Sequence, residues 1–153
     1  MRLKHIAISL AIVASFAAGT VAAPFLPHML PAAHAAAAPV APQLIDVTAM
    51  KSADLPLRAN SDLRTLTVYS TPDGSIAVQS GTVPKHTHQQ NEEVQYILEG
   101  SGTMWIGNER RDFRPGMLVV IPRGVAHGGA SASYKALAIK MPEPVAGDTQ
   151  LVN

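Results

Sequence analysis

The chain has no cysteine among its 153 residues. It therefore has no disulfide, and any metal site that it builds lacks thiolate ligands. Charge is scarce as well: only 15% of the residues are charged, and 12 basic side chains nearly balance 11 acidic ones. A chain this close to neutral has no basic patch large enough to bind nucleic acid, so that class of partner is excluded.

The first 35 residues differ in composition from the rest. They contain Arg2 and Lys4 but no acid, and an apolar run follows directly over residues 6–18. This order is typical of a secretory signal peptide, which we predict over residues 1–35. There are three alternatives: cleavage after Ala23, an uncleaved membrane anchor, and a cytoplasmic protein with a misassigned start.

Two signals that would change the export route are missing from this leader. It has no pair of adjacent arginines and no cysteine that could carry a lipid. The sequence therefore predicts the general secretion route and a periplasmic or secreted protein. Residues 36–42 are uncharged and rich in Ala and Pro, which predicts a disordered or extended linker before a folded domain over residues 43–153.

Short runs of β-branched and aromatic residues recur after the linker. They are residues 44–48, 65–70, 75–80, 94–98, 102–106, 118–121 and 134–140. Such runs predict strands, and Pro72-Asp73-Gly74 and Gly107-Asn108 supply tight turns between them. No helical period persists beyond about ten residues, and the best helix candidate is a turn or two near residues 52–57. The sequence predicts an all-β sandwich or barrel.

The predicted domain has three histidines, in two stretches. His86 and His88 are two residues apart, so on a strand both imidazoles point to one face and reach one point inside a barrel. The polar turn that follows resets the register and lets a carboxylate, Glu93 or Glu92, face the same way. In the second stretch a strand ends in a Pro-x-Gly turn that leads to His127.

The first stretch resembles the first motif of the cupin superfamily, a family of small β-barrels. The HxH pair is followed after four residues by Glu93 and after six more by Gly100, as in the family pattern. Gly81 stands one residue closer to His86 than that pattern has it. The spacing to Gly100 favours Glu93 over Glu92 as the carboxylate ligand and leaves Glu92 as a solvated neighbour.

The second stretch resembles the second cupin motif. It keeps that motif's glycine, Pro-x-Gly turn and histidine at Gly116, Pro122, Gly124 and His127. Ser131 stands where the family has Asn, which is not a ligand position. The resemblance covers residues 65–141 and implies a cupin-type double-stranded β-helix, or jelly-roll, barrel that is often a dimer. It also implies a metal ion held by four residues, His86, His88, Glu93 and His127.

Three imidazoles and one carboxylate suit a divalent first-row metal ion and leave two positions of an octahedron open. We expect Zn or Mn slightly ahead of Fe, because an exported chain takes up its metal outside the cytoplasm. Protonation of the imidazoles competes with the metal. Occupancy is therefore expected to fall as the pH drops below about 6.5.

Other residues near the motifs have less specific interpretations. Gln95 is two residues after Glu93 and is expected on the same face, as a polar residue of the pocket. Four larger side chains are expected in the core, with the pocket wall as the alternative: Tyr96, Met104, Trp105 and Met117. Three arginines alternate with acidic residues, which predicts a solvated edge strand: Arg110, Arg111 and Arg114.

Two classes of function are compatible with such a site. The first is a metal-dependent enzyme on a small polar molecule, of the dioxygenase, isomerase or decarboxylase type that the resemblance implies. The second is a non-catalytic periplasmic module that binds a metal or a small ligand. Glu92 and Tyr96 are the only further candidate acids or bases near the motifs, which disfavours elaborate acid–base chemistry. The expected partners are a small molecule and a second copy of the chain, with a membrane only if the signal is uncleaved.

Overall fold

The computed structural model describes residues 40–59 and 61–152 of the chain. The predicted signal peptide and residues 36–39 of the predicted linker lie outside this part. Within it, regular structure consists of ten strands and one short 3₁₀ helix, η2 (Ser52–Asp54). No helix of the described residues is long and apolar enough to cross a membrane. The all-β fold class predicted from the sequence is confirmed.

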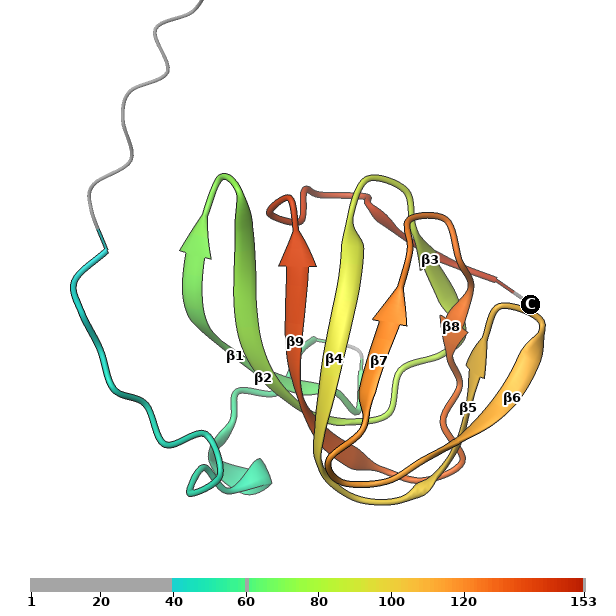
Figure 1. Ribbon diagram of the computed structural model, residues 1–153, viewed down its shortest axis with the longest axis horizontal. Coiled ribbons are helices and arrows are strands. Elements are labelled where there is room, and N and C mark those ends of the chain that lie inside the picture. The colour runs from blue at the N-terminus through green and yellow to red at the C-terminus, as the bar shows by residue number, and fades with distance from the viewer. Residues whose placement is uncertain (1–39, 60, 153) are drawn as a thin grey trace, which may run out of the picture. The chain divides into compact units, whose positions relative to one another are not determined.

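The first sheet has five antiparallel strands in the order β1-β2-β9-β4-β7, which lie side by side in Figure 1. Their bounds are β1 (Arg64–Thr71), β2 (Gly74–Gly81), β9 (Tyr134–Met141), β4 (Glu92–Glu99) and β7 (Leu118–Ile121). Strand β9 comes late in the chain and is inserted between β2 and β4. The centre of this sheet is therefore built from residues far apart in the sequence.

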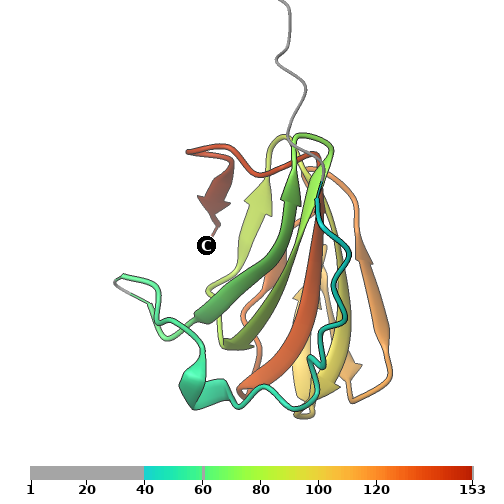
Figure 2. The same ribbon diagram turned by 90° about the vertical axis from the view of Figure 1, so that its left-hand side faces the viewer.

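The second sheet also has five strands, in the order β10-β3-β8-β5-β6. Their bounds are β10 (Thr149–Leu151), β3 (His86–His88), β8 (His127–Gly128), β5 (Gly102–Ile106) and β6 (Glu109–Phe113). Figure 2 shows β10 and the C-terminal end in a separate layer from β1 and β2 of the first sheet. The short strands β3 and β8 are in the middle of this layer, and they carry all three histidines of the predicted domain.

Side chains of the first sheet alternate between an inner face, directed at the second sheet, and an outer face. Residues of the inner face pack with residues of β5 and β6 in the hydrophobic core, whose buried members are Ile97, Met104, Phe113, Tyr134 and Ala136. Full burial of a side chain the size of Ile97 stabilises the fold by about 1.5–3 kcal/mol. Ile97 is near the end of β4 and Glu93 near its beginning, so the core fills one end of the barrel and leaves the other end to polar groups.

The outer face of the first sheet carries two rows of apolar residues that run across all five strands. Cross-strand pairing aligns Tyr69, Ile76, Ile139, Val94 and Val120 in one row. It aligns Leu66, Val78, Leu137, Tyr96 and Leu118 in the other. We call these ten residues the outer rows. Exposure is highest at the β7 edge, where Leu118 and Val120 are 59% and 61% exposed.

Six of the seven runs predicted as strands are strands, as β1, β2, β4, β5, β7 and β9. The two tight turns are also confirmed, since Thr71 pairs with Gly74 and Ile106 with Glu109 across them. The helix candidate at residues 52–57 is only the single 3₁₀ turn η2.

The strand predicted over residues 44–48 is wrong. Asp46 Oδ1 accepts hydrogen bonds from the backbone N–H groups of Thr48 and Ala49, each at 3.0 Å. This side chain bends the backbone into a turn, a conformation in which no ladder can form. Leu44 is fully exposed, so its apolar character reflects no burial in a sheet.

Candidate metal centre

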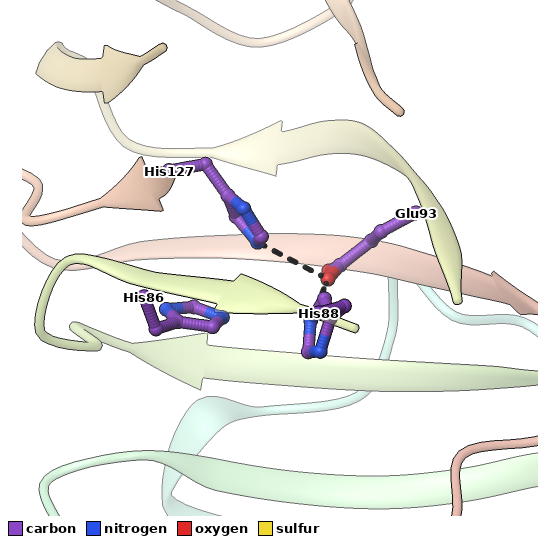
Figure 3. A group of neighbouring side chains, drawn as sticks. All are labelled: His86, His88, Glu93 and His127. Atoms are coloured by element: carbon purple, nitrogen blue, oxygen red, sulfur yellow. Dashed lines mark hydrogen bonds and ion pairs between the residues drawn. The ribbon is translucent and has the colours of Figure 1, made fainter. Parts of the chain in front are cut away.

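The structure brings together the four residues that the cupin resemblance implies as metal ligands. His86 and His88 both point inward from β3, and His86 is the direct cross-strand partner of His127 on β8. Glu93 enters from β4 of the first sheet. One ligand atom from each of the four residues lies within 4.8 Å of the others, and all four side chains are buried. Figure 3 shows the rings of His88 and His127 directed at the Glu93 carboxylate, with His86 beside them.

Backbone carbonyl groups orient two of the imidazole rings. His86 Nδ1 donates a hydrogen bond to Pro84 O at 2.8 Å, and His127 Nδ1 donates one to Val125 O at 3.0 Å. Each bond places the ring proton on Nδ1 and leaves the lone pair on Nε2, the form in which imidazole binds a metal. These two hydrogen bonds thus hold both rings in the tautomer that can bind a metal ion through Nε2.

The Nε2 atom of His127 is buried and has no hydrogen-bond partner among the described residues. A buried polar atom without a partner is costly, and such atoms are rare in folded proteins. The lone pair lies 3.4 Å from Glu93 Oε2. A divalent ion bound beside these two atoms satisfies both, so the donor set of three nitrogens and one oxygen fits a first-row metal.

A short hydrogen-bond chain holds the Glu93 carboxylate. Tyr134 donates to Gln95 Oε1 at 2.9 Å, and Gln95 Nε2 donates to Glu93 Oε1 at 2.8 Å. The second carboxylate oxygen, Oε2, is 2.8 Å from His88 Nε2. Because Gln95 occupies Oε1, the arrangement leaves Oε2 as the oxygen available to a metal ion.

The electrostatics of the cluster favour the protonation states that a metal requires. Burial raises the pKa of Glu93, but the neighbouring His127 and His88 rings and the charge of Lys140 outweigh it and hold that pKa well below its usual value. Burial lowers the pKa of His86 to about 4, and the neighbouring His127 acts in the same direction. Glu93 is therefore ionised and His86 neutral near pH 7.

The C-terminal segment supports His88 from the side opposite Glu93. Asp148 Oδ2 lies 3.1 Å from His88 Nδ1, and Thr149 Oγ1 lies 3.3 Å from the same atom. Gln90 N donates to Asp148 Oδ1 at 2.5 Å, which ties the carboxylate to the turn after β3. Such a carboxylate orients a ligating histidine and raises its basicity. The sequence contained no signal for Asp148, which lies in a loop outside the two motifs.

Lys140 is the second site residue that the sequence did not reveal. Its Nζ atom lies 3.1 Å from His88 Nε2 and 3.4 Å from Glu93 Oε2. Lys140 is directly opposite Glu93 in the pairing of β9 with β4. The alternation of β9 puts it on the inner face with Ala136 and Ala138, but only the pairing of β9 with β4 places that face beside the histidines.

Two glycines shape the backbone around the histidines. Gly124, in the Pro-x-Gly turn, has a φ of +76° and donates its N–H to His88 O at 2.8 Å. Gly128 has a φ of +96°, and a Cβ there would stand 2.9 Å from Pro84 O. Only glycine allows β8 to approach the His86 strand this closely. Pro122 and Gly124 thus act as the structural turn that the sequence predicted.

The neighbouring side chains divide between the predicted roles and others. Glu92 is exposed, whereas Glu93 is 2% exposed, and Gln95 is buried on the same face as Glu93. Met104 belongs to the core and Met117 packs against it. The core placement predicted for Tyr96 is wrong: this residue belongs to the outer rows and is 40% exposed.

Trp105 lies on β5, and the three predicted arginines lie on or directly after the neighbouring strand β6. Trp105 is only half-buried, and the Lys85 ammonium lies 4.4 Å from its ring centroid. The core placement predicted for Trp105 is therefore wrong. Strand β6 is the edge strand that the arginine pattern predicted. Arg110 and Arg111 of β6 are exposed, as is Arg114 directly after the strand.

Comparison with known proteins identifies the barrel. The family profile described as Cupin domain matches residues 75–139. A search of the curated proteins found no match. Among solved structures, the chain resembles a Klebsiella pneumoniae protein described as uncharacterized and conserved, with a double-stranded β-helix domain. The TM-score is 0.57 at 14% identity, with 74% of this chain and 99% of that chain covered.

Two enzymes of known structure have the same fold. Pac13, described as a nucleoside dehydratase, from Streptomyces, gives a TM-score of 0.57 at 11% identity, covering 67% of this chain and 88% of that chain. The polyketide cyclase RemF from Streptomyces resistomycificus gives 0.54 at 20% identity, covering 68% and 84%. At these identities the likeness concerns the fold alone. The profile match shows a cupin domain over residues 75–139 of this chain, and the double-stranded β-helix fold and the two motifs agree with it.

Proposed function

We propose that the protein binds one divalent first-row metal ion through its His-His-Glu-His cluster. We further propose that it is a metal-dependent enzyme that acts on a small polar molecule. One observation carries the proposal: the buried, unpartnered Nε2 of His127 faces Oε2 of Glu93, the carboxylate oxygen that does not bind Gln95. We expect Zn or Mn ahead of Fe, as the location of metal uptake predicts.

A bound divalent ion would supply Lewis-acid chemistry, the polarisation of a substrate oxygen. The chain's own residues provide the rest. His86 and His127 are held as neutral nitrogen donors by backbone carbonyl groups. Gln95 and Tyr134 hold the carboxylate of Glu93. A cavity of about 330 Å³ adjoins the cluster, and His86 and Glu93 form part of its wall, so a small molecule has access to the site.

Metal content of matched variants tests the binding step. Glu93→Gln removes the charge of the inner carboxylate, and Glu92→Gln removes the charge of its exposed neighbour. Elemental analysis of the purified full chain is expected to show loss of metal in Glu93→Gln and full metal in Glu92→Gln. Equal metal content in the two variants would contradict the assignment of Glu93.

The second candidate is a non-catalytic module that binds a metal or a small ligand. It is favoured by the cavity wall, where no carboxylate or imidazole other than Glu93 and His86 is present among the described residues. Turnover assays on the metal-loaded protein, with small hydroxy acids, keto acids, phenols and thiols and with oxygen consumption as one readout, separate the candidates. Bound metal without turnover of any compound would favour the module.

We also propose export to the periplasm or beyond, on the basis of the leader in residues 1–35. The test is the mass of the mature protein in the periplasmic and extracellular fractions. The proposal expects a chain that begins at Ala36, or at Pro24 if the alternative cleavage site is used. A full-length chain in the cytoplasmic fraction would contradict it.

A further inference from the structure

The space beside the metal cluster extends along the inner face of the first sheet. The cavity of about 330 Å³ that touches His86 and Glu93 shares four lining residues with a neighbouring cavity of about 490 Å³. The shared residues are Arg58, Gln79, Lys140 and Thr149. Because these residues line both, the two cavities are adjacent, and together they have room for one small molecule.

The cavity nearest the cluster is electropositive. Two cationic side chains, Arg58 and Lys140, line it, and the only carboxylate in its wall is Glu93. Oε2 of Glu93 lies 2.8 Å from His88, 3.4 Å from His127 and 3.4 Å from Lys140, and a metal ion bound as proposed would offset the charge of this carboxylate. Within residues 40–59 and 61–152, no carboxylate forms an ion pair with Arg58. This balance of charge disfavours a cationic ligand, and the unpaired Arg58 attracts an anionic group.

The neighbouring cavity is lined by uncharged polar groups and one acid. Thr65, Thr67 and Ser75 present hydroxyl groups to it, and Gln79 presents an amide. Glu143 also lines this cavity, and its Oε2 atom is buried without a hydrogen-bond partner among the described residues. An acceptor left in this state fits a ligand hydroxyl group, which can donate a hydrogen bond to it. The same charge repels a second anionic group, so the anionic end of a ligand belongs at the Arg58 side.

We propose that the two adjacent cavities together bind a small hydroxylated carboxylate, of the sugar-acid or hydroxy-acid class. The carboxylate lies by Arg58 and Lys140, next to the metal cluster, and the hydroxyl groups extend toward Gln79 and Glu143. The proposal rests on the proposed function, because the metal ligands form one wall of the site. It adds the class of substrate, which the cluster alone does not specify.

Calorimetric titration of the full-length, metal-loaded protein tests this class with matched pairs of probes. Each pair differs only by a carboxylate in place of a hydroxymethyl group: glucuronate and glucose, gluconate and sorbitol, lactate and propane-1,2-diol. At least one acid is expected to bind about tenfold or more tightly than its neutral partner, since a charged hydrogen bond is worth that much in affinity. If no acid exceeds its partner, the proposal is overturned.

The variant Arg58→Gln assigns the effect to the cavity. It touches none of the four metal ligands and is expected to weaken binding of the preferred acid about tenfold without changing the neutral partner. Arg114→Gln changes an exposed arginine that follows β6 and lines neither cavity; it is the matched control and is expected to change neither affinity. Equal affinity for the acid in wild type and Arg58→Gln would overturn the proposed orientation of the ligand.

Metal content is measured on the same preparations, which separates the two levels of the account. Full metal occupancy with no preference for any acid overturns the substrate class and leaves the metal proposal intact. Absence of metal from the wild type, after dialysis against Zn, Mn and Fe, overturns the proposed function. An acid preference that persists in that case and is lost in Arg58→Gln still supports the anionic site.

Discussion

The two faces of the five-stranded sheet have opposite chemistry although they come from the same strands. On β4 the inner residues Glu93 and Gln95 build the candidate site, and the outer residues Val94 and Tyr96 belong to the apolar outer rows. If a strand shifted its pairing register by one residue, its inner side chains would move to the outer face and its outer side chains to the inner face. The inner face also changes along its length, from the buried Ile97 to the polar end at Glu93. The same five strands thus carry a core, a polar site and an apolar surface that is exposed mainly at the β7 edge.

The largest difference between the faces is expected in stability. Ile97→Ala removes a fully buried side chain from the core and is expected to lower the free energy of unfolding by about 2–5 kcal/mol. Val120→Ala, on the outer face, is expected to lower it by less than about 0.5 kcal/mol. Urea unfolding of both variants measures the difference. Similar losses in the two would contradict the burial of Ile97 and the exposure of Val120.

The inner face is also expected to respond to pH when the metal is removed. His86 has a pKa of about 4 in the folded chain and an ordinary value of 6.5. Because its pKa is lower in the folded state, the unfolded state binds more protons between these values. The contribution of His86 to stability is therefore complete above pH 6.5 and is lost as the pH falls toward 4.

The loss from His86 between pH 7 and pH 5 is expected to be about 2 kcal/mol. Urea unfolding in the presence of a chelator, at both values, measures it. His86→Ala serves as the control, since its stability is expected to fall by about 2 kcal/mol less over the same interval. An equal fall in wild type and variant would contradict a buried neutral His86.

A smaller effect is expected from the hydrogen-bond chain that joins the core to the site. Gln95→Leu leaves Glu93 Oε1 and the Tyr134 hydroxyl without their partners. We expect metal affinity to fall about 10- to 100-fold, as for other groups that orient a ligand, with the four ligands still present. Competition with a chelator measures the affinity. Tyr134→Phe is expected to lower metal affinity less. Unchanged metal affinity in Gln95→Leu would contradict the role of Gln95 in positioning Glu93.

The smallest effect on stability is expected at the exposed edge of the outer rows. The homodimer that the cupin resemblance implies stays a prediction. Substitutions in the outer rows test whether this surface forms its interface. Leu118→Ser and Val120→Thr are expected to change stability by less than about 0.5 kcal/mol each. Sedimentation equilibrium of the wild type and of the double variant measures the oligomeric state. A wild-type dimer that survives the double substitution would place the interface elsewhere.

The sequence predicted those parts of the site that depend on local spacing. The HxH pair shares a face because strand residues alternate, and the Pro-x-Gly turn leads to His127. Most strands were equally visible, because β-branched runs and tight turns are local signals. The exception at residues 44–48 depended on one side chain, Asp46, that turns the backbone.

The remaining parts depend on pairings between distant strands. Lys140 reaches the cluster because β9 lies beside β4, and Asp148 reaches His88 because β10 pairs with β3. The same pairing decides which face is inner, and therefore why Tyr96 is exposed although it is aromatic. Residue spacing has no information on such register, so these contacts required the structure.

Metal content of the His86→Ala/His88→Ala double variant tests the central claim most directly. The full chain is purified, loaded with Zn, Mn or Fe, dialysed and subjected to elemental analysis, with circular dichroism to confirm the β fold. We expect about one metal ion per chain in the wild type and none retained in the double variant. Metal content that is the same in both proteins would contradict the assignment of the cluster as a metal centre.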